Sequence, residues 1–396
     1  MRNTIYLDYN ATTPCDPEVV DAMLPYFRDN FGNASSQSHS YGWLASDALE
    51  KSSFVIANAL NVSPNQIIYT SGATESINTI LKGVFNHKLN KKNHIITVET
   101  EHKAVLDVCQ NLEKKGARIT YLKVDENGII SLDELKKKIN SNTLMVAIMF
   151  ANNETGVLQP IESISEICKK HSSLFFSDAT QALGKISLGS FFSLVDFACF
   201  SSHKIYGPKG MGMIFIKKTD EINWESFVQG GGQQRKLRGG TYNIPGIVGF
   251  SKAIELNLKQ IEKFANKTEK LRNYMEELLL KIEGAKVNSR GFDRLPNTLN
   301  VSFSHVDGEQ LLNVLGQHIA VSNGSACNSA SINPSHVLSA MGIESSRALA
   351  SMRISLGKHN TLNDTKKAVN HIVKSVAKVR NNNILWKKNN PIIVRE

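Results

Sequence analysis

Apolar and polar positions along the first two-thirds of the chain predict strands separated by helices. Short apolar runs bounded by turn residues predict buried strands, and helical spacing of apolar residues between most of these runs predicts helices. The predicted strands are Ile67–Thr70, His94–Val98, Ile119–Leu122, Leu144–Phe150, Leu174–Ser177, Phe197–Ser201 and Met213–Ile216. The predicted helices are Ser76–Phe85, Ala104–Lys115 and Ile161–Lys170. This alternation is typical of an α/β domain with a mostly parallel seven-stranded sheet that has helices on both faces.

After about Ile254 the pattern changes, which predicts a second, smaller α/β domain with a boundary near residue 258. The charged amphipathic stretch Glu255–Glu283 predicts one long helix. Two further strands are expected at Thr298–Phe303 and Ser351–Leu356. The last helix is expected at Thr365–Val379, with one apolar face formed by Ala368, Ile372, Val376 and Val379.

Composition excludes several classes of protein. The 396 residues are 41% hydrophobic and 21% charged, which is enough to bury a large core. No apolar run reaches the roughly 18 residues of a membrane span, and the N-terminus MRNTIYLDYN does not resemble a secretory leader. The five cysteines are widely spread and have no CxxC spacing, which disfavours both a disulfide framework and a metal site. We therefore expect a protein of the reducing cytoplasm.

The net charge of +10 is concentrated toward the C-terminal end. From Lys366 onward the chain has eight Lys or Arg residues and one acidic residue, Glu396. Such an excess can attract nucleic acid or an acidic partner protein, whereas the more usual explanation is a solvated basic face. No aromatic interleaving or recognised nucleic-acid motif accompanies the charge, which favours the solvated face, and the nucleic-acid interpretation stays open.

Polar residues suited to catalysis or ligand binding occur where predicted strands end. After Ile67–Thr70, a glycine-containing turn leads into a helix whose N–H groups near Ala73, with the Thr74 hydroxyl, are suited to bind a phosphate. Capping of this helix by Ser71 or Thr74 is the alternative interpretation.

Asp178 and Lys204 also follow predicted strands. A carboxylate at position 178 is suited to pair with a protonated pyridine nitrogen, and helix capping is the alternative. Burial lowers the pKa of a lysine, so Lys204 is suited to form a Schiff base, although most lysines are simply exposed.

Cys327 differs from the other cysteines because glycine, serine, alanine and asparagine surround it. Such a setting indicates an exposed, mobile thiol, which a nucleophile that must reach its target requires. An incidental loop cysteine is the alternative. Cys109, Cys168 and Cys199 have apolar neighbours and are expected in the core, whereas Cys15 is uninformative.

These clusters occur together and in order along the chain. Through them the chain closely resembles the group I cysteine desulfurases. This branch of the class V aminotransferase superfamily includes the NifS and IscS enzymes. The matching stretches span nearly the whole chain and are Tyr6–Pro14, Thr70–Glu75, Thr100–Val105, Asn152–Gly156, Asp178–Gln181, His203–Gly210, Gly324–Cys327 and Arg353–Gly357.

The resemblance implies an enzyme of PLP fold type I that uses pyridoxal 5′-phosphate (PLP). Its expected reaction converts L-cysteine to L-alanine and transfers sulfur to Cys327 as a persulfide, and then to an acceptor protein. It also implies a homodimer, in which residues 15–258 form a large PLP-binding domain. Residues 1–14 with 259–396 are expected to form a small domain that carries the catalytic cysteine.

The resemblance further implies individual roles. Lys204 is expected to hold PLP and to move the substrate Cα proton, with His102 stacked on the ring. Asp178 is expected to pair with the ring nitrogen and Gln181 to bond the ring oxygen. The phosphate would be held by Ala73, Thr74, Ser201 and His203, and by Thr241 of the neighbouring subunit. Asn153 would contact the cofactor and, with Arg353, bind the substrate carboxylate.

The chain departs from the family pattern without losing a reacting group. Ser202 replaces the glycine of the usual Ser-Gly-His-Lys, and the basic tail is shorter than in members that contact the iron–sulfur scaffold. The expected pathway is therefore iron–sulfur cluster assembly or nucleic-acid thiolation such as DNA phosphorothioation. A selenocysteine lyase or another aminotransferase-like PLP enzyme is one alternative. A non-catalytic sulfur-pathway or nucleic-acid-binding protein that has kept the fold is another.

Overall fold

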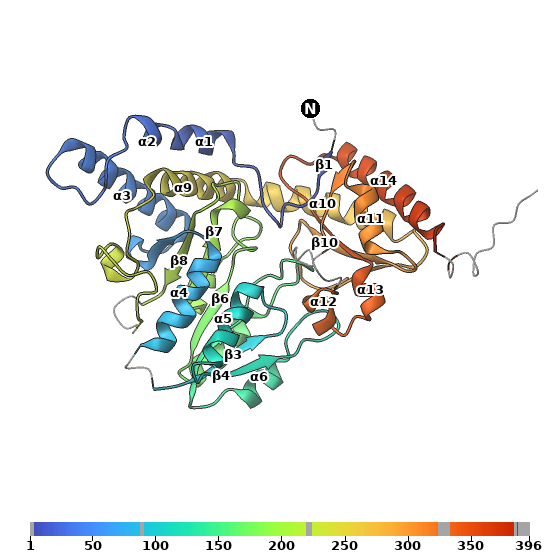
Figure 1. The fold of residues 1–396 in the computed structure, drawn as a ribbon, viewed down its shortest axis with the longest axis horizontal. Helices are drawn as coiled ribbons and strands as arrows, with labels where there is room; N and C mark the ends of the chain where they lie inside the picture. Colours follow the sequence, from blue (N-terminus) through green and yellow to red (C-terminus); the bar gives the residue numbers. More distant parts are fainter. Residues whose placement is uncertain (1–3, 88–90, 219–223, 324–332, 384–385, 387–396) are drawn as a thin grey trace, which may run out of the picture.

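The computed structural model describes residues 4–87, 91–218, 224–323, 333–383 and 386 (Figure 1). The strands are β1 Ile5–Tyr6, β2 Ile67–Thr70, β3 His94–Val98, β4 Arg118–Leu122, β5 Thr143–Ala147, β6 Leu174–Asp178, β7 Phe197–Ser201, β8 Gly212–Ile216, β9 Ala285–Val287, β10 Thr298–Phe303, β11 Ile319–Ala320 and β12 Ser351–Ser355. The helices are α1 Pro17–Met23, α2 Pro25–Arg28, α3 Ser40–Leu60, α4 Ala73–Asn86, α5 Lys103–Glu113, α6 Leu132–Lys138, α7 Ile161–Lys170, α8 Phe191–Leu194, α9 Ile244–Lys259, α10 Ile261–Leu279, α11 Gly308–Leu315, α12 His336–Ala340, α13 Ser345–Leu349 and α14 Leu362–Arg380. Short 3₁₀ helices occur at η1 Pro64–Gln66, η2 Ser202–Lys204 and η3 Gln234–Lys236.

The large sheet has seven strands in the order β2-β8-β7-β6-β5-β3-β4. The β7-β6-β5-β3-β4 strands are parallel, whereas β8 runs antiparallel to both of its neighbours. All seven strands coincide with the predicted strands to within a few residues, so the predicted α/β fold with a mostly parallel seven-stranded sheet is confirmed.

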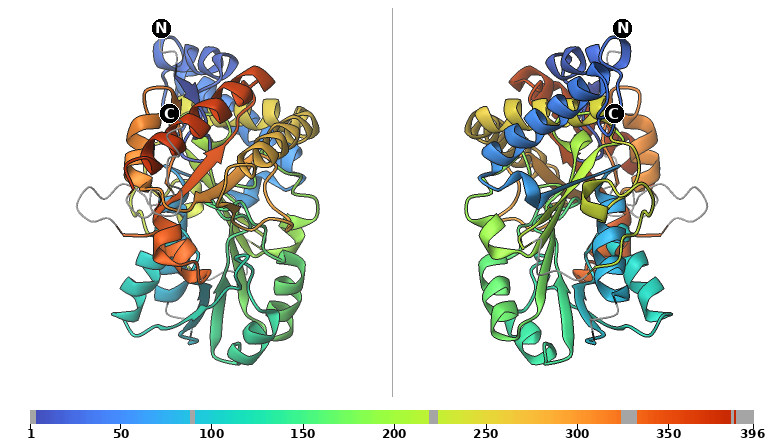
Figure 2. Two further views of the ribbon diagram at one scale, coloured as in Figure 1. Left: turned by 90° about the vertical axis from the view of Figure 1, so that its right-hand side faces the viewer. Right: turned by 90° about the vertical axis from the view of Figure 1, so that its left-hand side faces the viewer.

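Helices cover both faces of this sheet because side chains alternate between the faces along each strand. In β8, Met213 and Phe215 join one buried cluster with side chains of α3, α7 and α9. Ile214 and Ile216 join a second cluster with α4 and α5. The side views show helices on either side of the strands (Figure 2). Burial on both faces explains why the strand sequences are almost continuously apolar.

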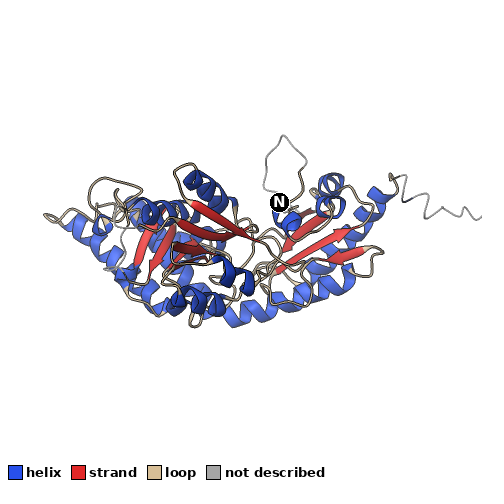
Figure 3. Cartoon of the chain, turned by 90° about the horizontal axis from the view of Figure 1, so that it is seen from below, coloured by secondary structure: helices blue, strands red, loops and turns tan. Residues whose placement is uncertain are grey.

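A smaller group of strands lies beside the large sheet (Figure 3). It contains the antiparallel sheet β12-β10-β9 and the parallel pair β1-β11. Leu7, close to the N-terminus, is buried in the same cluster as side chains of α10, α11 and α14. This shared core supports the proposed grouping of residues 1–14 with 259–396, apart from residues 15–258.

The prediction of one helix over Glu255–Glu283 is wrong. Two helices occupy this region, and Gln260 separates them with φ −120° and ψ 14°. Ile254 of α9 packs into the core of the large sheet, whereas Met275 of α10 packs into the smaller core. The chain turns between the helices because their apolar faces belong to different cores.

Two strand ends also differ from the prediction. The strand predicted at Leu144–Phe150 ends at Ala147, and Asp178 is the last residue of β6 instead of the residue after the strand. Among the helices that the structure describes, none is sufficiently long and apolar to span a membrane.

Candidate active site

The predicted site residues meet at one edge of the large sheet. The strands β3, β5, β6 and β7 are parallel, and β2 and β7 are both antiparallel to β8, so the carboxyl ends of these five strands share an edge. Ligands of open α/β sheets bind at this edge. The side chains placed there are Thr74 after β2, His102 after β3, Asn153 after β5, Asp178 at the end of β6 and Lys204 after β7.

Lys204 ends the single turn η2 that follows β7. Its Nζ donates hydrogen bonds to the carbonyl oxygens of Asn10 and Ala11, both at 2.7 Å. Burial and the nearby positive charge of Arg353 lower the pKa of Lys204 to about 8, although Asp178 opposes this shift. The amine therefore loses its proton more easily than an ordinary lysine, as a Schiff-base nucleophile requires.

His102 is the residue that caps the start of α5. Its Nδ1 accepts a hydrogen bond from the Ala104 N–H at 3.1 Å, so the proton of the neutral ring lies on Nε2. Burial lowers the pKa of His102, although the Asp178 carboxylate opposes this shift. The residue keeps part of its surface exposed to solvent at the site edge, so this burial is incomplete. A neutral imidazole here is suited to stack on an aromatic ring.

Gln181 is connected to Lys204 through a shared acceptor. The carbonyl oxygen of Asn10 accepts from Gln181 Nε2 at 3.0 Å as well as from Lys204. On its other side, the Gln181 carbonyl oxygen accepts a hydrogen bond from Lys185 Nζ. Neither Asn10 nor Lys185 was assigned a role from the sequence. Asn10 lies in a stretch that matches the family, but no pattern around Lys185 marks it as buried.

The start of α4 has the geometry of a phosphate cradle. Gly72 precedes the helix with φ 154°, which L side chains rarely adopt, and no side chain caps the helix. Capping by Ser71 or Thr74 is therefore wrong as an interpretation. A Cβ on Gly212 would lie 2.6 Å from the Gly72 Cα, and one on Gly72 would lie 3.7 Å from Ser201 Oγ. The uncapped N–H groups are suited to bind an anion.

His203 and Thr241 flank this cradle differently. The His203 Nδ1 bonds Thr12 Oγ1 at 3.0 Å, and burial together with Lys204 lowers the His203 pKa to about 4. A neutral ring is therefore expected at neutral pH. Thr241 is exposed, and no hydrogen bond of the described residues connects it to the Lys204 site.

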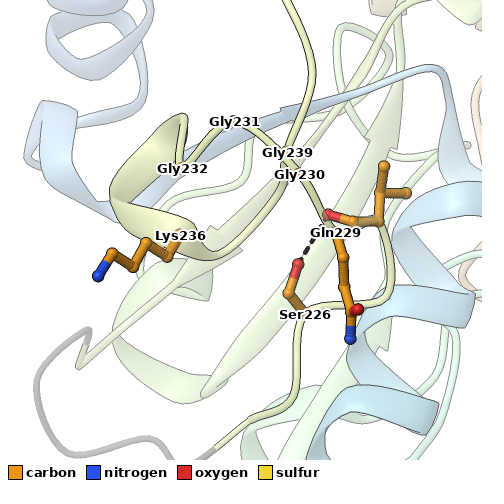
Figure 4. A pocket seen from close by; sticks show the side chains of 8 residues that line it. Ser226, Gln229, Gly230, Gly231, Gly232, Lys236 and Gly239 are labelled. Atoms are coloured by element: carbon orange, nitrogen blue, oxygen red, sulfur yellow. Dashed lines mark hydrogen bonds between the residues drawn. The ribbon is translucent and has the colours of Figure 1, made fainter.

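The glycine-rich segment before Thr241 borders a cavity of about 330 Å³ (Figure 4). In Figure 4 the Ser226 hydroxyl donates to the Val228 carbonyl, at 2.8 Å. The Lys236 side chain points away from this hydrogen bond. The segment is tied to the large sheet because Arg238 Nε binds the Glu75 carboxylate of α4 at 2.8 Å. Gln234 adds two hydrogen bonds to the backbone of Tyr69 in β2. Thr241 is thus carried by a segment fixed next to the start of α4.

Arg353 and Asn153 are brought together, as predicted. The Arg353 Nη1 donates to the Asn153 carbonyl at 3.2 Å, and Nη2 binds the Asp8 carboxylate at 2.7 Å. The Arg353 Nε is buried and has no partner among the described residues. A buried donor without a partner needs an acceptor, and a substrate carboxylate meets that need.

Cys327 lies outside the described residues. On one side of that segment, Ser322 exchanges backbone hydrogen bonds with Arg353. On the other side, the Ser335 hydroxyl binds the Glu154 carboxylate at 2.5 Å. The described residues that flank the segment therefore both contact the edge of the site.

Two buried glutamates at the site were missed from the sequence. Burial raises the pKa of Glu154 to about 7, although its hydrogen bond from Ser335 opposes the shift. Burial and the Asp178 charge raise the pKa of Glu101 well above its ordinary value. Both belong to stretches that match the family, yet sequence alone does not reveal that a glutamate is buried. No group of three or more His, Cys, Asp or Glu side chains suited to a metal ion occurs in the described part of the chain.

Comparison with known proteins agrees with this geometry. Residues 5–367 match the family model "Aminotransferase class-V". A cysteine desulfurase IscS of Rickettsia typhi is 43% identical over 383 residues, which cover 96% of this chain and 93% of the relative. A NifS-like protein of known structure superposes with a TM-score of 0.88 at 40% identity, covering 96% of this chain and 100% of that one. DndA of Streptomyces lividans gives a TM-score of 0.75 at 34% identity, covering 87% and 97%.

The chain therefore belongs to the aminotransferase class-V family, with the sheet of PLP fold type I. Within that family it is a cysteine desulfurase of the NifS and IscS group, and its cofactor is PLP. The residues present fit this cofactor, because a buried amine of lowered pKa and an uncapped helix start lie at the same sheet edge.

Proposed function

We propose that Lys204, Asp178 and His102 perform the desulfurase chemistry and that Cys327 receives the sulfur of L-cysteine. The observation that carries this proposal is the position of Lys204, whose buried amine lies at one sheet edge with Asp178 and within the electrostatic reach of Arg353. An amine that deprotonates near pH 8 is suited both to hold a carbonyl cofactor and to move a proton.

The division of work follows from the contacts. When bound, PLP supplies an electron sink for the bond broken at the substrate Cα. Asp178 would pair with the pyridine nitrogen and keep it protonated, and His102 would stack on the ring. The N–H groups at Ala73 and Thr74, with Ser201 and His203, would hold the phosphate. Lys204 would act as the acid–base that moves the substrate Cα proton.

Arg353 orients the amino acid through its carboxylate. Because Asp8 and the Asn153 carbonyl already occupy its two terminal nitrogens, the buried Nε is the donor that lacks a partner. A substrate carboxylate would bond this Nε and displace or share one of the existing contacts, with Asn153 alongside. Arg353 also exchanges backbone hydrogen bonds with Ser322, the residue five positions before Cys327 in the sequence.

Sulfur transfer then needs only a thiolate. The Cys327 thiolate attacks the substrate sulfur, an S–S bond forms, and the Cβ–S bond breaks with its electron pair left on the substrate carbon. Protonation of that carbon yields L-alanine, and Cys327 keeps the sulfur as a persulfide. An acceptor thiol or an added reductant then removes the sulfur.

The test is the stoichiometry of the reaction. The PLP-loaded enzyme with L-cysteine and a thiol reductant should form L-alanine and sulfide in equal amounts. L-Serine, which has the same carboxylate and amine but no sulfur, is the matched control and should form no alanine. Conversion of L-cysteine to a keto acid without sulfide would instead indicate an aminotransferase and contradict the proposal.

A homodimer is supported by an apolar surface on the N-terminal helices. Phe31 and Trp43 are 65% and 58% exposed, and Phe27, Leu44 and Phe54 are also exposed. These residues belong to or adjoin α2 and α3, at the end of the molecule away from α10 and α14 (Figure 1). Apolar surface of this extent is typical of a protein interface. We propose that a second copy covers it and that Thr241 of each copy reaches the phosphate of the other.

Charges placed in this surface should separate the subunits. We expect wild type to have twice the 43.8 kDa mass of one chain, and Phe31→Asp with Trp43→Asp to shift it to the monomer. Mass is measured by light scattering after size exclusion. The separated subunits should also lose PLP faster on dialysis, because Thr241 no longer reaches the phosphate. Val373→Asp alters a residue that is 41% exposed on α14 and should leave the dimer intact. A monomeric wild type would contradict the dimer.

The acceptor is proposed to be a protein of a reducing compartment such as the cytoplasm. The described cysteines Cys15, Cys109, Cys168 and Cys199 are all free thiols, which supports that setting. The similarity to DndA and the basic residues of α14 support a nucleic-acid-linked pathway, whereas the similarity to IscS enzymes supports iron–sulfur cluster assembly.

A further inference from the structure

Lys185 is a buried lysine at the edge of the active site. Its side chain is 3% exposed and belongs to the turn that follows β6, four residues after Gln181. The Nζ donates hydrogen bonds to the Gln181 Oε1 and, at 2.8 Å, to the Asn10 Oδ1. Lysines are almost never fully buried unless their amine is paired. The role of Lys185 must therefore lie in these two hydrogen bonds.

The contact with Gln181 decides which way its amide faces. A glutamine amide has an acceptor at one end and donors at the other, whereas a lysine amine offers donors. With Lys185 present, the carbonyl end must face Nζ and the NH2 end must face the opposite way. One N–H of that end bonds the Asn10 carbonyl at 3.0 Å. The second N–H has no acceptor among the residues that the structure describes.

We propose that Lys185 is a positioning residue that holds the Gln181 amide so that its N–H, not its carbonyl oxygen, faces the ring oxygen of PLP. This inference rests on the role that the family resemblance implies for Gln181, a hydrogen bond to the ring oxygen. Without Lys185 the amide could rotate and present its oxygen to the negatively charged ring oxygen, which would remove a hydrogen bond and add a repulsion.

Both hydrogen-bond partners of the Lys185 amine are oxygen atoms. Complete burial, with Lys204 and Arg353 nearby, lowers the pKa of Lys185 well below its ordinary value. Gln181 Oε1 and Asn10 Oδ1 both accept from Nζ, so the amine acts as a donor to each of them. A donor on Nζ requires the carbonyl end of the Gln181 amide to face it.

A purely structural role is the competing explanation, because Asn10 joins the two parts of the fold. Its side chain also bonds Thr298 Oγ1 at 2.9 Å and Asn297 Nδ2 at 3.2 Å. Asn297 contacts the same Asn10 oxygen as Lys185 but does not bond Gln181. Asn297→Ala is therefore a matched control that weakens the Asn10 contact and spares the amide orientation.

The readout is the pH titration of the visible absorption band of the PLP-loaded enzyme. A donor at the ring oxygen withdraws negative charge, so that oxygen holds a neighbouring proton less strongly. Lys185→Met should raise the pH of the colour transition by roughly half to one unit, the scale of one lost hydrogen bond. Lys185→Gln keeps an N–H donor and should titrate closer to wild type. Asn297→Ala should lower the melting temperature without moving the transition.

A double-mutant comparison separates orientation from charge. Gln181→Met should itself raise the transition, and adding Lys185→Met to it should cause no further shift. Additive shifts would mean that Lys185 acts by charge, which would overturn the inference. An unshifted Lys185→Met with a shifted Gln181→Met would also overturn it.

If Gln181→Met has no effect, the proposed role of Gln181 fails instead. If Lys185→Met does not retain PLP, Lys185→Ala takes its place, and an unshifted Lys185→Ala beside a shifted Gln181→Met decides against Lys185.

Discussion

Replacing Cys327 with alanine should abolish sulfide release while the protein keeps its yellow colour. Lys204, Asp178 and the cradle at α4 do not depend on the thiol, so cofactor binding should be unchanged. The sulfur, however, has no acceptor, and we expect sulfide and alanine formation to fall by roughly 1,000-fold or more, the scale of removing a catalytic nucleophile. Sulfide is measured by a colorimetric assay and alanine by amino-acid analysis.

Cys15 provides the matched control for this substitution. It is the described cysteine that is partly exposed, and burial raises its pKa, so it is a poor nucleophile. Cys15→Ala should retain full activity. If Cys327→Ala releases sulfide at the wild-type rate, the persulfide mechanism is refuted, and a direct elimination of sulfide from the substrate would have to replace it.

Replacing Lys204 with alanine should remove both the colour and the activity. The substitution deletes the amine that holds PLP and moves the proton, so we expect alanine formation to fall by more than roughly 10,000-fold. The visible spectrum after PLP addition and dialysis reports the loss directly. Lys209→Ala, which changes an exposed lysine five residues away, should leave colour and rate unchanged.

The same lysine predicts a pH dependence of cofactor loading. Below its pKa of about 8 the amine is protonated and cannot attack the aldehyde, whereas above it the attacking form dominates. The rate at which the apoprotein gains colour should therefore rise with pH through a midpoint about 8. A midpoint near the ordinary lysine value of 10.5 would mean that the amine is not desolvated and would contradict the described environment.

Strand positions were predicted well because the large sheet is covered on both faces. Strands such as Phe197–Ser201 are buried throughout, and that burial leaves continuous apolar runs in the sequence. Helix ends were less well predicted. The break at Gln260 depends on two separate cores that attract the apolar faces of α9 and α10, and such tertiary packing is not visible in local spacing.

From the sequence, the candidate site was predicted only at positions that belong to recognisable motifs. Lys204 and Asp178 follow strands, so the topology explains why they lie at one edge of the sheet. Asn10 and Lys185 were not predicted as site residues, because their contacts join segments 175 residues apart. Burial of Lys185 and Glu101 likewise follows from the assembled fold, since nothing local distinguishes a buried ionisable residue from an exposed one.

The most direct test of sulfur transfer is mass spectrometry of the peptide that contains residue 327. The PLP-loaded enzyme is mixed with L-cysteine without an acceptor or reductant, alkylated and digested. The peptide should gain the mass of one sulfur atom, and a reductant should remove it. A peptide of unchanged mass in an enzyme that is forming alanine would contradict the transfer of substrate sulfur to this thiol.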